Sequence, residues 1–195
     1  LDDLYVATCD HEIKEAVEAF GGKVVMTSDT HERASDRIAE AGLEIKADVY
    51  VMIQGDEPAT DPEMIDLAIE PFKQDDIVGC VNLIKRIDNE EDFLNPDTIK
   101  VVMDNKSNAL FMSRQAIPSV NNIPFAKLSC YKQVCIIPFT HEYLMRYTEL
   151  EPTPLEVAEK IDMMRFIEHG YNVKMVETKY DTHAVDRIRD IAKVE

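Results

Sequence analysis

Val51-Met52-Ile53-Gln54-Gly55-Asp56-Glu57-Pro58 is the stretch that decides the fold. An apolar run typical of a strand ends at a glycine, and a carboxylate follows just before a new helix. Ligands of an open α/β sheet bind at the carboxyl ends of its strands, so Asp56 is placed to hold a metal ion on a phosphate. The alternative is a solvated turn that caps the next helix, and the turn residues alone leave both interpretations open.

The composition describes a globular chain of one domain. Its 195 residues are 45% hydrophobic and 30% charged, enough to build a substantial core. The formal charge of −17 argues against nucleic acid as a partner, because the phosphate backbone would be repelled. The sequence has no apolar run of membrane-spanning length and no leader before the first expected strand. We therefore expect a cytoplasmic protein with no membrane partner.

Strand and helix patterns alternate in the amino-terminal part of the chain. The expected strands cover 4–8, 24–26 and 49–53, and the expected helices cover 11–20, 34–43 and 61–72. Gly21-Gly22 ends the first helix, and Asp61 is the expected N-cap of the third. This order is typical of a doubly wound, mainly parallel, Rossmann-like α/β sheet.

The pattern changes after residue 76. The expected strands there cover 77–85, 98–103, 109–113, 131–137 and 173–177, and the expected helices cover 140–148, 155–169 and the chain from Asp186. The first three of these strands have no long helix between them, which predicts an antiparallel excursion. Residues 115–128 lack periodicity and are expected to form a loop. No repeat or linker divides the chain, so 1–195 are expected to form a single domain.

Several ordered motifs carry a resemblance to one enzyme family. In chain order they are Ala7-Thr8-Cys9-Asp10, 20–27, 31–39, 54–58, Asn95-Pro96, 100–102, Ala109-Leu110 with Ser113-Arg114, 152–156 and Val185-Asp186. Over essentially the whole chain they resemble CMP-Kdo synthetases, the 3-deoxy-manno-octulosonate cytidylyltransferases. The resemblance implies a nucleotide-diphospho-sugar transferase fold. It also implies a nucleotidyltransferase that joins CTP to Kdo or a related 2-keto-3-deoxy sugar acid, uses Mg²⁺, releases pyrophosphate and serves surface polysaccharide synthesis.

The resemblance also has implications for architecture. Members of the family begin with a strand and a basic loop that binds the triphosphate, and we expect such a unit to precede Leu1. No glycine-rich phosphate loop of standard spacing occurs within the 195 residues. The resemblance further implies a homodimer, formed through the excursion at about residues 105–130.

Five residues correspond to the metal and nucleotide positions of the family. Asp56 and Asp186 match its metal-binding aspartates, which implies that both hold Mg²⁺ and act in catalysis. Ser35, Arg37 and Gln54 match positions that lie against the nucleotide. From the residues alone, an N-cap is the favoured role of Asp186. The alternatives for the other residues are a local ion pair for Arg37 and a polar residue at a sheet edge for Gln54.

Arg114, Gln133, Asp162 and Arg165 fall where the resemblance implies the sugar-acid site. A planar cation is suited to clamp a carboxylate, so the two arginines are the candidates for that contact, with surface salt bridges as the alternative. Gln133 stands where a histidine is common, and Asp162 begins a pair that is usually Glu-Gln. Because the changes at Gln133 and Asp162 alter hydrogen bonding to substituents, the sugar is expected to be Kdo or an amino- or deoxy-substituted relative. In the segment that the resemblance places near the nucleotide, Arg33-Ala34 stand where the family usually has Ser-Gly, which implies a changed contact to the ribose or the base.

Two other classes of protein are alternatives to this interpretation. One is a non-catalytic homologue that binds the nucleotide or the sugar acid and lacks the triphosphate loop. The other is an acidic Ca²⁺-binding domain, which would require aspartates at EF-hand spacing, and the sequence has no such loop.

Overall fold

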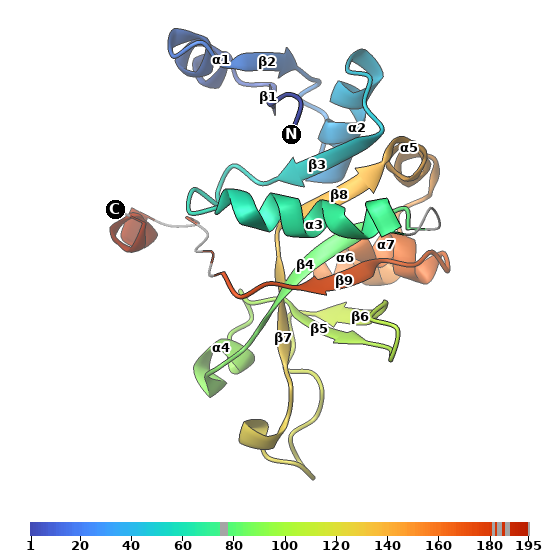
Figure 1. Cartoon of the computed structure of the whole chain (residues 1–195). Coiled ribbons are helices and arrows are strands. Elements are labelled where there is room, and N and C mark those ends of the chain that lie inside the picture. The colour runs from blue at the N-terminus through green and yellow to red at the C-terminus, as the bar shows by residue number, and fades with distance from the viewer. Residues whose placement is uncertain (75–77, 181, 183–184, 186–187, 195) are drawn as a thin grey trace.

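The computed structural model describes residues 1–74, 78–180, 182, 185 and 188–194. The strands are β1 Tyr5–Thr8, β2 Lys23–Met26, β3 Val49–Ile53, β4 Val81–Arg86, β5 Lys100–Met103, β6 Ala109–Ser113, β7 Tyr131–Val134, β8 Ile136–Thr140 and β9 Lys174–Glu177 (Figure 1). The α-helices are α1 His11–Ala19, α2 Ala34–Glu44, α3 Pro62–Gln74, α4 Glu90–Leu94, α5 His141–Glu149, α6 Pro154–Glu159 and α7 Met163–Glu168. Two 3₁₀ helices are η1 Phe125–Lys127 and η2 Ile188–Lys193.

The strands form an α/β fold of mixed direction. β1 pairs with β2 in parallel, and β3 pairs with β8 antiparallel. A five-stranded sheet has the order β6-β5-β7-β4-β9, in which β9 runs parallel to β4 and β7 runs antiparallel to it. An antiparallel bridge between Cys80 and Phe139 links β8 to the start of β4. The α/β class is therefore confirmed, and the later strands add the expected antiparallel pairs.

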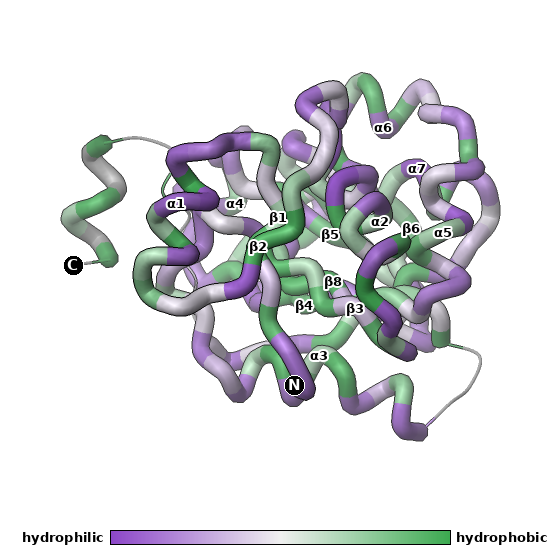
Figure 2. The backbone as a smooth tube through the Cα atoms, turned by 90° about the horizontal axis from the view of Figure 1, so that it is seen from above, coloured by the Kyte–Doolittle hydropathy of each residue, from purple (hydrophilic) through white to green (hydrophobic). Residues whose placement is uncertain are grey.

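Helices cover both faces of the central strands. Met64 and Ala68 of α3 pack on Leu83 of β4, whereas Ile84, the next residue of that strand, packs with α5 and α7 residues such as Phe166. Successive strand residues point to opposite faces, so one apolar strand supplies both cores. Seen from above, the apolar β4 and β8 lie in the middle of the molecule (Figure 2).

Local signals set most helix boundaries as predicted. The Asp10 side chain accepts hydrogen bonds from the backbone N–H groups of Glu12 and Ile13, and this cap begins α1. Gly21 follows the helix at φ 83°, a left-handed conformation that favours glycine. Asp61 accepts from the Glu63 N–H at 2.8 Å and caps α3.

Two predicted elements were wrong because each is broken in the middle. The expected strand 131–137 is two strands separated at Cys135, with β7 paired to β4 and β5, and β8 paired to β3. The expected helix 155–169 is α6 and α7, separated at Lys160, which adopts φ 56° and ψ 49°. At the carboxyl end, a 3₁₀ helix begins at Ile188 in place of the expected α-helix, and Asp186 lies outside the described residues.

The excursion at residues 105–130 packs on α4, a helix that the sequence patterns did not predict. Asn89 caps α4 by accepting from the Asp92 N–H at 2.7 Å. Phe93 of this helix and Cys130 are buried together, and the Phe125 ring lies 5.2 Å from the Phe93 ring. Dimerisation through this excursion stays a prediction. Among the described helices, none combines the length and apolar character that crossing a membrane requires.

Candidate active site

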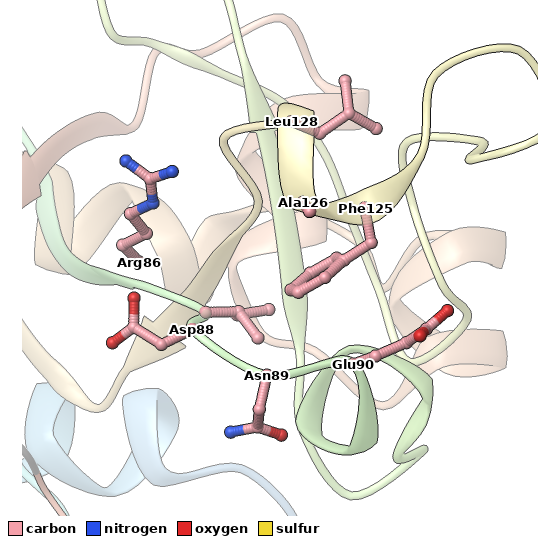
Figure 3. A pocket seen from close by; sticks show the side chains of 8 residues that line it. Arg86, Asp88, Asn89, Glu90, Phe125, Ala126 and Leu128 are labelled. Carbon is pink, nitrogen blue, oxygen red and sulfur yellow. The ribbon is translucent and has the colours of Figure 1, made fainter.

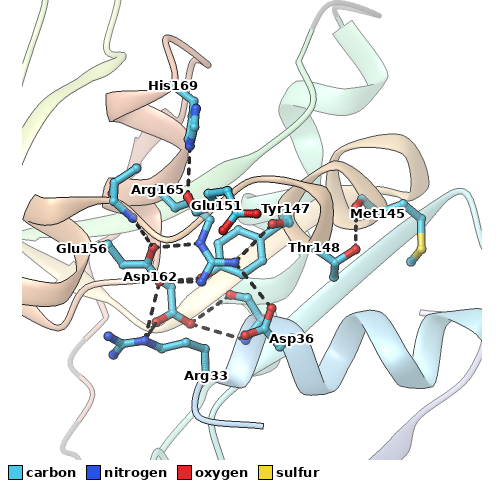
Figure 4. A network of polar contacts seen from close by, with 12 residues as sticks. Arg33, Asp36, Met145, Tyr147, Thr148, Glu151, Glu156, Asp162, Arg165 and His169 are labelled. Carbon is cyan, nitrogen blue, oxygen red and sulfur yellow. Dashed lines mark hydrogen bonds and ion pairs between the residues drawn. The ribbon is translucent and has the colours of Figure 1, made fainter.

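A polar network joins the amino-terminal end of α2 to the break between α6 and α7 (Figure 4). Ser35 is fully buried, and its hydroxyl donates to Asp162 Oδ2 at 3.0 Å. Burial raises the pKa of Asp162, and the Ser35 hydrogen bond opposes that rise. The structure thus brings together one residue that we predicted for the nucleotide and one that we predicted for the sugar acid.

Arg165 forms a buried ion pair with Glu156 in the same network. Nε and Nη2 donate to the two carboxylate oxygens, each at 2.7 Å, and the two residues are 4% and 1% exposed. Nη1 donates to the Tyr147 carbonyl at 3.2 Å and lies 3.6 Å from Asp36 Oδ1. Burial would raise the pKa of Glu156, but the hydrogen bonds and charge of Arg165 hold it below its usual value.

Arg33 reaches the same network from the residue before α2. Its Nε lies 3.6 Å from Glu156 Oε1 and 3.8 Å from Asp162 Oδ1. These are ion-pair distances that are too long for hydrogen bonds. The sequence motifs singled out Arg33 only as a departure from the family pattern. The distances show that it faces Asp162, which we predicted for the sugar-acid site, and Glu156, which we did not.

A cavity of about 240 Å³ opens beside this network. Its walls come from the loop before α2, from α2, from the start of α6 and from α7. The lining residues are Thr30, His31, Glu32, Arg33, Asp36, Pro152, Glu156, Val157 and Arg165. A site lined by both cations and carboxylates can bind a ligand that carries both an anionic group and hydroxyl donors.

Arg114 is anchored to the end of α6. Its Nε donates to the Glu159 carbonyl at 2.9 Å, and its Nη1 donates to the Pro96 carbonyl at 3.3 Å. The Glu159 carboxylate in turn accepts from the Arg114 N–H and the Ser113 hydroxyl, both at 2.9 Å. Arg114 is thus tied to the element that carries Glu156, although it does not line the cavity.

Arg37 and Gln133 each have a partner within the fold. Arg37 Nη1 donates to Thr27 Oγ1 at 2.5 Å and to the Ser28 carbonyl at 3.1 Å. Gln133 Nε2 donates to Asn82 Oδ1 at 2.6 Å. Neither lines the cavity, and their predicted ligand contacts stay predictions.

Gln54 and Asp56 lie at the carboxyl end of β3, where the sequence placed them. The Gln54 carbonyl accepts from the Glu57 N–H at 3.1 Å, which forms the turn. The Val185 N–H donates to the Asp56 carbonyl at 2.8 Å, so the chain next to Asp186 runs past this turn. Asp186 lies outside the described residues, and its sharing of a metal ion with Asp56 stays a prediction.

The predicted metal ligands have the donor chemistry that Mg²⁺ takes. Carboxylate oxygens are hard ligands, and Mg²⁺ is commonly held by one or two carboxylates together with substrate phosphates. Within the described residues, no cluster of three or more His, Cys, Asp or Glu side chains could hold a metal ion. Asp56 and Asp186 would supply the two carboxylates that such substrate-bridged binding of Mg²⁺ uses.

A second cavity of about 520 Å³ lies away from these residues (Figure 3). It is lined by 86–90 at the end of β4 and the start of α4, and by Phe125, Ala126 and Leu128 around η1. None of the described residues that we predicted for the site lines it.

Known proteins are similar to this chain over its full length. The cytidylyltransferase family model matches residues 1–179. The 3-deoxy-manno-octulosonate cytidylyltransferase of Geobacter metallireducens is 39% identical over 203 aligned residues, with 100% of this chain and 80% of the relative covered. The corresponding protein of Geotalea uraniireducens is 40% identical, with 100% and 81% covered.

Solved structures agree with the sequence matches. A CMP:2-keto-3-deoxy-manno-octonic acid synthetase complexed with CTP superposes with a TM-score of 0.92 at 31% identity, covering 100% of this chain and 79% of that chain. A 4-diphosphocytidyl-2C-methyl-D-erythritol synthase from Anaerococcus prevotii gives 0.60 at 15% identity, which shows a shared fold alone.

Proposed function

This chain belongs to the cytidylyltransferase family, and from that premise we propose that it transfers the cytidylyl group of CTP to a 2-keto-3-deoxy sugar acid, Kdo or a relative, releasing pyrophosphate. One observation carries the proposal. A synthetase complexed with CTP matches the whole chain at a TM-score of 0.92 and 31% identity. The family match and the superposition on this synthetase confirm the resemblance found in the sequence, including the nucleotide-diphospho-sugar transferase fold.

In the proposed reaction, the anomeric hydroxyl oxygen of the sugar acid attacks the α-phosphorus of CTP and loses its proton to solvent. The bond from that phosphorus to the β-phosphate bridging oxygen breaks, and pyrophosphate leaves. Positioning and charge repulsion make up most of the barrier. Bound Mg²⁺ would supply positive charge at the phosphate oxygens, and Asp56 and Asp186 are the residues proposed to hold it. Gln54, two residues before Asp56, is proposed to orient the nucleotide through its amide.

The α2 network is the proposed acceptor side of the site. The bond between Ser35 and Asp162 fixes α2 against the start of α7, next to the 240 Å³ cavity. Arg37 holds the start of the loop before α2 through Thr27 and Ser28, and it is kept with Ser35 as a proposed contact of the nucleotide. Arg114 and Gln133 are kept as proposed contacts of the sugar acid, as are a homodimer and a place in surface polysaccharide synthesis.

The proposal is tested by measuring pyrophosphate release from CTP and Mg²⁺ with Kdo and with amino- and deoxy-substituted derivatives of Kdo. We expect release that requires CTP and one of these sugar acids together. Asp56→Asn serves as the inactive control. Binding of CTP without pyrophosphate release from any member of the panel would overturn the proposal and favour a non-catalytic binding homologue.

A further inference from the structure

Arg33 has the most available guanidinium group beside the 240 Å³ cavity. Its contacts to Glu156 and Asp162 run through Nε at 3.6 and 3.8 Å, and neither terminal nitrogen donates a hydrogen bond to a described residue. Its side chain is 21% exposed. In Figure 4 the terminal nitrogens lie on the side away from Asp36. The edge that carries Nη1 and Nη2 is therefore free to receive an anion with two oxygens.

Arg165 is in the opposite position. Its bidentate edge is occupied by the Glu156 carboxylate, and Nη1 is used by the Tyr147 carbonyl and approached by Asp36. The Tyr147 ring lies 4.1 Å from the guanidinium carbon and covers one face. Binding a substrate carboxylate bidentately would require Arg165 to abandon a buried partner.

We propose that Arg33, and not Arg165, binds the carboxylate of the sugar acid, and that Arg165 is a positioning residue that fixes Glu156 beside it. This inference rests on the proposed function and names a specificity-determining residue within it. Arg33 occupies a position where the chain departs from the family's usual Ser-Gly, so the contact would be particular to this protein and its close relatives.

The surroundings of Arg33 favour a polyhydroxy acid over a triphosphate. Glu32, Asp36 and Glu156 line the same cavity. Ionised carboxylates accept hydrogen bonds from sugar hydroxyls, but they repel phosphate oxygens. A volume of about 240 Å³ lies just below the range of drug-sized pockets and suits a monosaccharide. A sugar acid can bind to both the basic and the acidic residues of the cavity, with its carboxylate on Arg33 and its hydroxyls on the acidic side chains.

The test is calorimetric binding of Kdo and its amino- and deoxy-substituted derivatives, each as the free acid and as the methyl ester. The proteins are the unaltered chain, Arg33→Met, Arg33→Lys and the control Arg146→Met, which removes an exposed arginine paired with Glu149. For the best-bound acid, we expect Arg33→Met to weaken affinity at least tenfold while ester affinity stays within twofold. Arg33→Lys should recover part of the loss, because it restores the charge without the planar fork. Arg146→Met should change neither ligand's affinity.

CTP affinity and the thermal midpoint of each variant complete the design, and Arg33→Lys carries the test if Arg33→Met does not fold. Equal losses for acid and ester, loss of CTP affinity with acid affinity retained, or no binding of any acid by the unaltered chain would each overturn the inference. Pyrophosphate release by the unaltered chain is measured in parallel. Turnover with an acid whose affinity is indifferent to Arg33 would sustain the proposed function and refute only this residue's role.

Discussion

Replacing Arg165 by methionine should destabilise the protein strongly at neutral pH. Methionine keeps much of the side-chain length but removes the guanidinium, which makes two 2.7 Å hydrogen bonds to Glu156. Glu156 is 1% exposed, so its carboxylate would stay out of water with Arg33 as its remaining cation at 3.6 Å. Removing one partner of a buried ion pair typically costs about 3–5 kcal/mol, and we expect a loss within that range.

The pH dependence of the free energy of unfolding gives a second expectation, with a definite direction. The pKa of Glu156 is lowered in the folded protein, so its contribution is present above the unfolded pKa of 4.5 and is lost as pH falls through the folded value. Without Arg165, burial should instead raise the pKa of Glu156 above its unfolded value. The Arg165→Met protein then gains stability as pH falls, so the difference between the two proteins should shrink from pH 7 toward pH 4.

Urea unfolding followed by circular dichroism at pH 7.5, 6 and 4.5 measures both effects, with the slope of each transition checked for constancy. Arg146→Met is the matched control, because Arg146 pairs with Glu149 at 2.7 Å on the surface. The loss of unfolding free energy in Arg146→Met should stay below about 1 kcal/mol at every pH. If Arg165→Met costs no more than Arg146→Met at pH 7.5, or if its cost grows on acidification, the reasoning is refuted.

Three further outcomes are expected. Asp56→Asn should lower pyrophosphate release by at least about a hundredfold with little change in thermal midpoint, and unchanged turnover would remove the proposed metal role. The stability of Asp162→Asn relative to the unaltered chain should be highest near pH 7 and should fall on acidification. Burial raises the pKa of Asp162, so the folded carboxyl gains its proton at a higher pH than the unfolded one and stabilises the unaltered chain. Urea midpoints at pH 7 and 4 that moved the other way would contradict this. Lys100→Met should lower the free energy of unfolding in urea by about 3 kcal/mol. The reason is that Lys100 Nζ donates to the Asn95, Thr98 and Arg114 carbonyls at 2.8, 2.6 and 2.5 Å. A loss no greater than that of Lys106→Met would count against this.

Elements with a clear period and a local stop signal were predictable from the sequence. The strand 49–53 and the helix after Asp61 agree with β3 and α3 because a continuous apolar run, a capping aspartate and a following proline act locally. Gly55 ends β3 before Asp56 as expected. The resemblance placed the remaining blocks in one family, which the full-length comparisons confirm.

The break between α6 and α7 could not be predicted by the same signals. No proline or glycine lies within 155–169, and Lys160 adopts its left-handed conformation in the folded chain. The ion pair depends on this break. Residues nine apart in an unbroken helix lie about half a turn out of phase, so Glu156 and Arg165 would face opposite sides. The sequence therefore offered only two roles for Arg165, a sugar-acid contact implied by the resemblance or a surface salt bridge, although tertiary structure gives it the buried partner Glu156.

Arg33 shows the complementary difficulty. The sequence marks it as an exception to a motif, and its partners Glu156 and Asp162 lie more than a hundred residues further along the chain. Only the packing of α2 against the α6–α7 break brings them together. Such long-range groupings follow from tertiary contacts and have no local pattern.

In the proposed reaction, the anomeric oxygen of a sugar acid displaces pyrophosphate from the α-phosphorus of CTP. Phosphorus NMR of the reaction with a sugar acid carrying ¹⁸O at the anomeric hydroxyl tests this directly. We expect a CMP-sugar whose phosphorus resonance shows the isotope shift of one ¹⁸O, with unlabelled pyrophosphate as the other product. A CMP-sugar without that shift, or CMP and pyrophosphate formed equally without the sugar acid, would contradict it.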